Sequence, residues 1–134
     1  MTRTGCDTGF VVRMGTGHLE VDQAISDAKR GLRVLIIPTI VVTEFLRLHY
    51  RLGTGSHAEG FIIALQSQPY VQIVEVGFTT ALRAAKLSHS LGLPTVDALI
   101  LAACLEAGCD EFWTTDRQHF AIAEHQGIVK IIWL

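Results

Sequence analysis

Apolar residues along the chain fall into short runs and periodic clusters, separated by glycine, proline and threonine. The run at residues 32–37 is rich in leucine, isoleucine and valine and predicts a buried strand. Further strands are predicted at residues 2–6, 71–76, 111–115 and 128–134. The segment at residues 2–6 is unusually polar for a buried strand, so we expect its beginning to be exposed or frayed.

Between these strands, apolar residues recur at the spacing of amphipathic helices. Such helices are predicted at residues 40–52, 56–66, 81–91, 95–107 and 118–125. Hydroxyl side chains at three helix beginnings are predicted N-caps, namely Thr39, Thr79 and Thr95. Because strands alternate with helices, the pattern predicts an α/β fold with a mainly parallel sheet.

Length and composition indicate one globular domain covering residues 1–134. Of the 134 residues, 49% are apolar and 18% are charged, and no linker or low-complexity stretch divides them. No apolar run approaches the roughly 20 residues of a membrane-spanning helix, and the N-terminus lacks a signal-peptide apolar segment. We therefore expect a cytoplasmic protein without membrane contact. Cys6, Cys104 and Cys109 lack the number and spacing of a disulfide framework, and Cys104 is expected to contribute only to packing.

Four acidic residues hold comparable positions relative to the predicted elements. Asp7 and Asp116 each follow a strand, whereas Glu44 and Asp97 lie near the beginnings of helices. In open α/β sheets the functional crevice lies at the carboxyl ends of the strands. The four carboxylates are therefore expected to meet at one edge of the sheet.

Taken singly, most of these acids have an ordinary structural interpretation. A negative charge at Asp97, in a first helical turn, interacts favourably with the helix dipole. Asp7 and Asp116 could be ordinary turn residues, because aspartate is common in turns. Glu44 differs from them, because it places a carboxylate within a strongly apolar helix. Together the four placements indicate a site for Mg²⁺ or Mn²⁺, which prefer oxygen ligands and could activate water against a phosphodiester. With 11 basic and 13 acidic residues, the chain cannot hold nucleic acid by net charge alone.

The motifs around these acids resemble the PIN-domain family, in particular the VapC-type toxins of toxin–antitoxin pairs. The matching segments are Asp7-Thr8-Gly9, PTIVVTEF around Glu44, LPTVDALILAACLEAG around Asp97 and FWTTDRQHF around Asp116. The resemblance implies an α/β/α sandwich with about five parallel strands. It also implies Mg²⁺- or Mn²⁺-dependent ribonuclease activity, with these four acids as catalytic and metal-binding residues and the hydroxyl of Thr114 beside them. The partners it implies are an RNA substrate, a protein antitoxin and a second copy of the chain.

Neighbouring polar residues suggest supporting roles. Thr8 is predicted to hydrogen-bond around Asp7 and orient it. Thr114 lies two residues before Asp116, on the strand side that Asp116 would share, which favours a role in holding that acid. Trp113 is expected to belong to the core or to an interface rather than to a base-stacking surface.

Basic residues near the acids are candidates for RNA contacts. Arg47 and Arg51 follow Glu44 by three and seven residues and share its side of the predicted helix. Arg117 and His119 flank Asp116 and could touch RNA as well. The six histidines show no spacing typical of zinc ligands.

Two other kinds of function are compatible with parts of this pattern. Asp-Thr-Gly is also the signature of aspartic proteases, but those proteases are nearly all β-structure, which the predicted helices contradict. A second possibility is a non-catalytic PIN-like module that binds RNA or protein. Within the nuclease hypothesis, the sequence leaves open an RNA-processing role outside any toxin–antitoxin pair, the RNA that is cleaved, and the number of metal ions.

Overall fold

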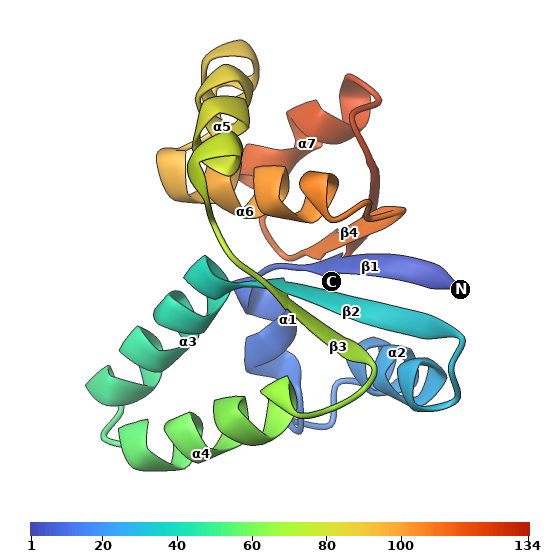
Figure 1. The fold of residues 1–134 in the computed structure, drawn as a ribbon, viewed down its shortest axis with the longest axis vertical. Coiled ribbons are helices and arrows are strands. Elements are labelled where there is room, and N and C mark those ends of the chain that lie inside the picture. The colour runs from blue at the N-terminus through green and yellow to red at the C-terminus, as the bar shows by residue number, and fades with distance from the viewer.

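The strands form a single parallel sheet between two layers of helices in the computed structural model, which describes residues 1–134 (Figure 1). The sheet has five strands in the order β3-β2-β1-β4-β5, and every neighbouring pair is parallel. The strands are β1 (Thr2–Cys6), β2 (Arg33–Pro38), β3 (Val71–Val74), β4 (Glu111–Thr114) and β5 (Lys130–Trp133). This architecture confirms the predicted α/β/α sandwich.

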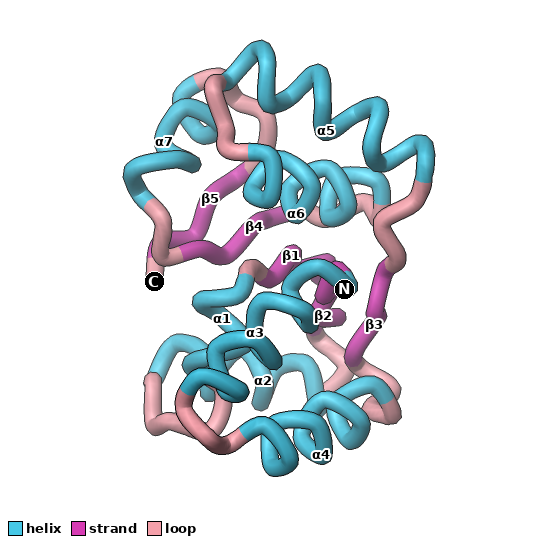
Figure 2. Tube along the Cα trace, turned by 90° about the vertical axis from the view of Figure 1, so that its left-hand side faces the viewer, coloured by secondary structure: helices cyan, strands magenta, loops and turns pink.

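The helices divide between the two faces of the sheet. Helices α1 to α4 cover one face and α5 to α7 the other (Figures 1 and 2). Their bounds are α1 (Thr8–Arg13), α2 (Leu19–Lys29), α3 (Thr39–Arg51), α4 (Gly55–Gln66), α5 (Phe78–Leu91), α6 (Thr95–Glu106) and α7 (Arg117–His125). None of these helices has the length and apolar character needed to cross a bilayer.

Burial on both faces explains the apolar run of β2. Leu35, Ile36 and Ile37 are all fully buried, although successive side chains in a strand point to opposite faces. A sheet that is covered on both sides requires apolar residues at every position, not at every second one. Cys6 and Cys104 are also fully buried, and all three cysteines of the chain are free, as predicted.

The polar strand β1 lies at the centre of the sheet because its polar residues have specific partners. Thr2 is already paired with Arg33, so the beginning of the strand is not frayed. Thr4 is fully buried, and its hydroxyl accepts a 2.7 Å hydrogen bond from the Arg33 guanidinium. A Cβ atom at Gly5 would lie only 3.0 Å from the Cys104 side chain, so glycine allows α6 to pack closely on the strand.

Two helices that cover the sheet, α1 and α2, are not predicted by the sequence pattern. Helix α1 has only 6 residues, too few to show a helical period. Helix α2 buries Val21, Ala24 and Ala28, and two alanines give a weak apolar signal.

The three predicted N-caps are wrong by one or two residues. The capping positions are held by Pro38, Gly77 and Pro94. Both prolines have extended backbone, with ψ of 146° and 149°, as an N-cap requires. Thr39 and Thr95 therefore are the first helical residues, and α5 begins at Phe78, before Thr79.

The direction of the strand order reverses between β1 and β4. From β1 the chain proceeds outward through β2 to β3, and β4 then pairs with the other side of β1 and is followed by β5. The helices that follow β1 and β4, α1 and α7, lie on opposite faces of the sheet (Figure 1). The carboxyl ends of these two strands therefore form a topological switch point, where ligands of open α/β sheets bind.

Candidate active site

The structure brings the four predicted acids together at this switch point. Asp7 directly follows β1, and Asp116 follows β4 by two residues. Glu44 comes from α3 and Asp97 from the first turn of α6. The negative charges of Asp116, Glu44 and Asp7 all act on Asp97, which shows that the four carboxylates share one electrostatic environment.

Helix N-termini position three of these carboxylates. Asp7 is the N-cap of α1, where its Oδ1 accepts a 3.0 Å hydrogen bond from the backbone N–H of Phe10. Asp116 is the N-cap of α7, and its Oδ1 accepts from the backbone N–H of His119 at 3.1 Å. Asp97 lies in the first turn of α6. The positive ends of the helix dipoles thus offset part of the repulsion between the acids.

Thr114 connects the two acids that follow strands. Its Oγ1 donates a 2.5 Å hydrogen bond to Asp7 Oδ2 and accepts a 3.0 Å hydrogen bond from the backbone N–H of Asp116. The Thr114 side chain is fully buried and Asp7 is only 6% exposed. This hydroxyl therefore fixes the ends of β1 and β4 relative to each other, inside the protein.

Thr8 contacts a different acid from the one predicted. Its hydroxyl donates a 2.5 Å hydrogen bond to Glu44 Oε1 rather than to Asp7. The reason is that Asp7 turns back to cap α1, while Thr8 is the first residue of that helix and faces α3. Thr8 thereby holds Glu44 in place and links α1 to α3.

Burial raises the proton affinity of two of the acids, Asp7 and Asp97. Burial raises the pKa of Asp7, and hydrogen bonds from Thr114 and from backbone N–H groups oppose this effect. Burial, followed by the negative charge of Asp116, raises the pKa of Asp97 from 3.8 to about 6. The site concentrates negative charge that a cation would compensate.

His119 lies between two of the acids, Asp97 and Asp116. The sequence suggests this residue only as an RNA contact. Its Nδ1 is 2.6 Å from Asp116 Oδ2 and 3.2 Å from Asp97 Oδ2. The hydrogen bond with Asp116 raises the pKa of His119. The spacing of Asp116 and His119, three residues apart at a helix beginning, is the sequence signal that could have placed both side chains at one site.

The donor atoms present fit a divalent cation. Asp97, Asp116 and His119 offer ligand atoms that all lie within 4.8 Å of one another. Carboxylate oxygens are the ligands that Mg²⁺ and Mn²⁺ take in proteins, and Mn²⁺ also accepts imidazole nitrogen. The raised pKa of Asp97, caused first by burial and then by the charge of Asp116, is a second indication, because a bound cation would offset both effects.

A close approach of α1 to the chain after β4 explains the glycine of the Asp-Thr-Gly motif. A Cβ atom at Gly9 would lie 2.7 Å from Thr115 Oγ1 and 3.2 Å from Asp7 Oδ1. Glycine therefore permits the segment that carries Asp116 to contact α1 directly. Neither the role of Gly9 nor that of Thr115 is evident from sequence, since the two residues are far apart in the chain.

The predicted RNA-contacting arginines have different surroundings. Arg47 and Arg51 are exposed on α3, and neither forms an ion pair. The guanidinium of Arg117 lies 4.8 Å above the ring of Trp133. Trp113 is buried and contacts Phe10 edge-to-face at 5.7 Å, as expected of a core residue.

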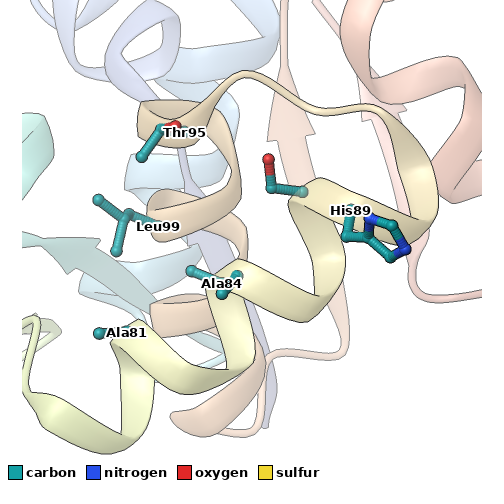
Figure 3. A pocket seen from close by; sticks show the side chains of 7 residues that line it. Ala81, Ala84, His89, Thr95 and Leu99 are labelled. Carbon is teal, nitrogen blue, oxygen red and sulfur yellow. The ribbon is translucent and has the colours of Figure 1, made fainter.

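A surface hollow of about 550 Å³ lies away from the acids, between α5 and α6 (Figure 3). It is lined mainly by small and apolar side chains, among them Ala81, Ala84 and Leu99. None of the four acids lines it. The hollow therefore is not the candidate active site.

Solved structures of similar fold include several toxins. A toxin–antitoxin complex from Klebsiella pneumoniae matches with a TM-score of 0.71 and 20% identity, over 98% of this chain and 96% of that one. VapBC2 from Rickettsia felis, bound to a DNA fragment from its promoter, matches with a TM-score of 0.76 and 13% identity, over 100% and 99%. The Sarcin-Ricin loop cleaving toxin VapC20 from Mycobacterium tuberculosis matches with a TM-score of 0.66 and 19% identity, over 90% and 94%. At these identities, the likeness shows the fold.

Sequence comparison assigns the family. No curated protein matches the chain. The model of the PIN domain matches residues 6–125, which contain all four acids together with Thr8, Thr114 and His119. The chain thus belongs to the PIN domain family.

Proposed function

We propose that the protein is an endoribonuclease that depends on a divalent metal, Mg²⁺ or Mn²⁺, and acts in the cytoplasm as the toxin of a toxin–antitoxin pair. The observation that carries this proposal is the convergence of Asp7, Glu44, Asp97 and Asp116 at the topological switch point of the sheet. Membership of the PIN domain family and the fold shared with VapC toxins support it.

In this proposal the four carboxylates hold the metal and form the catalytic centre. A bound divalent cation would polarise the scissile phosphodiester and lower the pKa of a water molecule. The protein supplies fixed geometry: Thr114 orients Asp7, Thr8 orients Glu44, and helix α7 orients Asp116 through its backbone. Such support of ligands by neighbouring hydrogen bonds is typical of metal sites.

RNA binding would depend on local positive charge, because the net charge of the chain is −2. Arg47 and Arg51 are free to contact phosphates along α3, which also carries Glu44. Arg117 directly follows Asp116, and its guanidinium on Trp133 lies beside the end of β4, where Trp133 pairs with Thr114. We propose these three arginines as RNA contacts.

Exposed apolar side chains support the proposed protein partners, an antitoxin and a second copy of the chain. Phe78 and Leu82 on α5 are 81% and 53% exposed, and Ile63 on α4 is 65% exposed. Phe78 and Leu82 lie four residues apart on the same helix, and adjoining exposed apolar side chains are typical of interaction sites. Co-purification with the product of a short neighbouring reading frame, and the molecular weight of the isolated protein in solution, would test the two partners separately.

Cleavage assays test the enzymatic part of the proposal. Purified protein should cleave RNA in the presence of Mg²⁺ or Mn²⁺ and lose this activity in excess chelator. Asp7→Asn, Glu44→Gln, Asp97→Asn and Asp116→Asn should each remove most of the activity. Matched controls are Asp22→Asn and Glu20→Gln, whose side chains are exposed on α2. Activity that survives chelation, or equal losses in controls and site variants, would contradict the proposal.

The toxin assignment needs a cellular test, because an RNA-processing nuclease would have the same active site. Expression should arrest growth of a bacterial host, the Asp116→Asn variant should not, and a cognate antitoxin should relieve the arrest. Unimpaired growth with abundant active enzyme favours RNA processing. Folded protein that binds RNA or a protein partner but never cleaves RNA favours a non-catalytic module.

A further inference from the structure

His119 contacts the acidic cluster with a single nitrogen atom. Its Nδ1 lies 2.6 Å from Asp116 Oδ2 and 3.2 Å from Asp97 Oδ2, and these two oxygens come from different helices. The side chain of His119 is 35% exposed, so it reaches the cluster from the solvent side. Nδ1 therefore occupies the space in which the two carboxylates converge.

The backbone of His119 is fixed in this position. Its N–H donates a 3.1 Å hydrogen bond to Asp116 Oδ1, which caps α7. One oxygen of Asp116 thus anchors the backbone of His119 while the other faces its imidazole. Histidine at this place is held by the same turn that positions the acid.

The spacing of the three donor atoms resembles that of ligands around one cation. Neighbouring ligands in octahedral coordination, with bonds of about 2.1–2.2 Å, are separated by roughly 3 Å. The 3.2 Å distance from Nδ1 to Asp97 Oδ2 matches this value, and the 2.6 Å distance to Asp116 Oδ2 would need to increase by a few tenths of an ångström. All three atoms lie within 4.8 Å of one another, as in a single coordination sphere.

We propose that His119 is a ligand of the catalytic metal through Nδ1, next to Asp97 and Asp116, and that it makes the site prefer Mn²⁺ to Mg²⁺. This inference rests on the proposed metal-dependent function. Transition-metal ions such as Mn²⁺ accept imidazole nitrogen beside carboxylate oxygen, whereas Mg²⁺ strongly prefers oxygen ligands. A site with oxygen ligands alone would lack this source of discrimination.

Pulsed electron paramagnetic resonance of the Mn²⁺-loaded protein tests the ligand directly. The parent should show the ¹⁴N coupling of a coordinated imidazole, and His119→Leu should lose it. His125→Leu is the matched control, because His125 lies exposed in the last turn of the same helix and should not affect the signal. If His119→Leu does not fold, His119→Gln replaces it, since its side-chain amide cannot give an imidazole signal.

Metal affinity provides the second measurement. His119→Leu should weaken Mn²⁺ binding roughly tenfold and Mg²⁺ binding much less, so that the preference for Mn²⁺ falls. Bound Mn²⁺ without ¹⁴N coupling, or a coupling that persists in both variants at position 119, would overturn the role of His119 and leave the carboxylate site intact. Absence of Mn²⁺ binding in the parent, or equal binding in Asp97→Asn, would instead overturn the proposed metal site, and this inference with it.

Discussion

The Thr114 hydroxyl donates a hydrogen bond to Asp7 and accepts one from the backbone N–H of Asp116. One buried oxygen thus joins the two carboxylate-bearing segments that follow adjacent strands. The arrangement exists because β1 and β4 are neighbours in the sheet and end at the same edge. Asp7 is separated from Thr114 by 107 positions in the chain. The geometry of the site thus depends on sheet topology and on this hydroxyl together.

Thr114→Val tests this dependence because valine keeps the shape of threonine and removes the hydrogen bonds. Asp7 would lose a donor and the N–H of Asp116 an acceptor in a buried region, which costs about 1–3 kcal/mol for each unsatisfied group. We expect the free energy of unfolding in chelator to fall by about 2 kcal/mol or more, and RNA cleavage to fall at least tenfold.

Thr114→Ser is the matched control, since serine retains the hydroxyl. It should keep most of the activity and lose stability only through the missing methyl group, roughly 1 kcal/mol. Urea unfolding and initial cleavage rates measure both effects. A valine variant as active and stable as the serine variant would show that the hydroxyl is dispensable.

Gly9→Ala should disturb the contact between α1 and the chain after β4. The added methyl group would meet Thr115 Oγ1 at 2.7 Å and Cγ2 at 3.0 Å. We expect a loss of roughly 1–2 kcal/mol in the free energy of unfolding, in spite of the better helix propensity of alanine, and a reduced cleavage rate.

Thr115→Ala removes both clashing atoms, so the double variant should recover stability and activity relative to Gly9→Ala. The four proteins form a double-mutant cycle, and a positive coupling between the two sites is the expected result. Additive effects without any rescue would mean that the glycine is needed for another reason.

Much of the sheet and the four acids could be predicted from sequence because each has a local signal. The apolar run of β2 reflects burial on both faces, and a carboxylate at Glu44 stands out within an apolar helix. The Asp-Thr-Gly motif and the FWTTDRQHF segment lie at strand ends, where α/β folds place their sites. The acids lie at strand and helix termini, which led us to expect them at one edge of the sheet. In the structure they lie at the carboxyl ends of β1 and β4.

Contacts between distant segments could not be predicted in the same way. The sequence pattern assigned Thr8 to its neighbour Asp7, but the packing of α1 on α3 gives it Glu44. His119 meets Asp97 only because α7 begins beside the first turn of α6. The central position of the polar strand β1 likewise depends on Arg33, whose guanidinium binds Thr4 from the neighbouring strand.

Arg47→Ala tests the proposed RNA surface. Arg47 is exposed on the helix that carries Glu44, so its loss should weaken RNA binding without affecting the fold. If it contacts one phosphate, the slope of log K against log salt should decrease in magnitude by about 0.7–0.9. Binding to catalytically inactive Asp116→Asn protein at several salt concentrations measures this slope. Arg30→Ala, at the exposed C-cap of α2, is the control, and an equal effect there would indicate nonspecific electrostatics.

Asp97→Asn links the stability of the protein to the charge of the site. Burial and the charge of Asp116, with smaller contributions from Glu44 and Asp7, raise the folded-state pKa of Asp97 from 3.8 to about 6, against an opposing effect of His119. Below about pH 3 the carboxyl is protonated in both folded and unfolded chains, because this lies below both pKa values. As the pH rises from about 3 to about 6 the unfolded chain ionises first, so the free energy of unfolding of the parent decreases and then levels off.

The neutral asparagine should lack this decrease. In chelator, Asp97→Asn should match the parent at about pH 3 and exceed it at pH 7 by as much as about 3 kcal/mol, since each pKa unit corresponds to about 1.4 kcal/mol. Mn²⁺ should remove most of this difference, because it stabilises the parent by about 2.7 kcal/mol at a hundredfold excess over its dissociation constant and the variant much less. Urea unfolding at both pH values, with chelator and with Mn²⁺, measures all four conditions.

Asp22→Asn, which changes the same charge on an exposed part of α2, should follow the parent throughout. An Asp97→Asn protein that is less stable than the parent at pH 7 in chelator, and an equal response of both to Mn²⁺, would assign Asp97 a structural role instead.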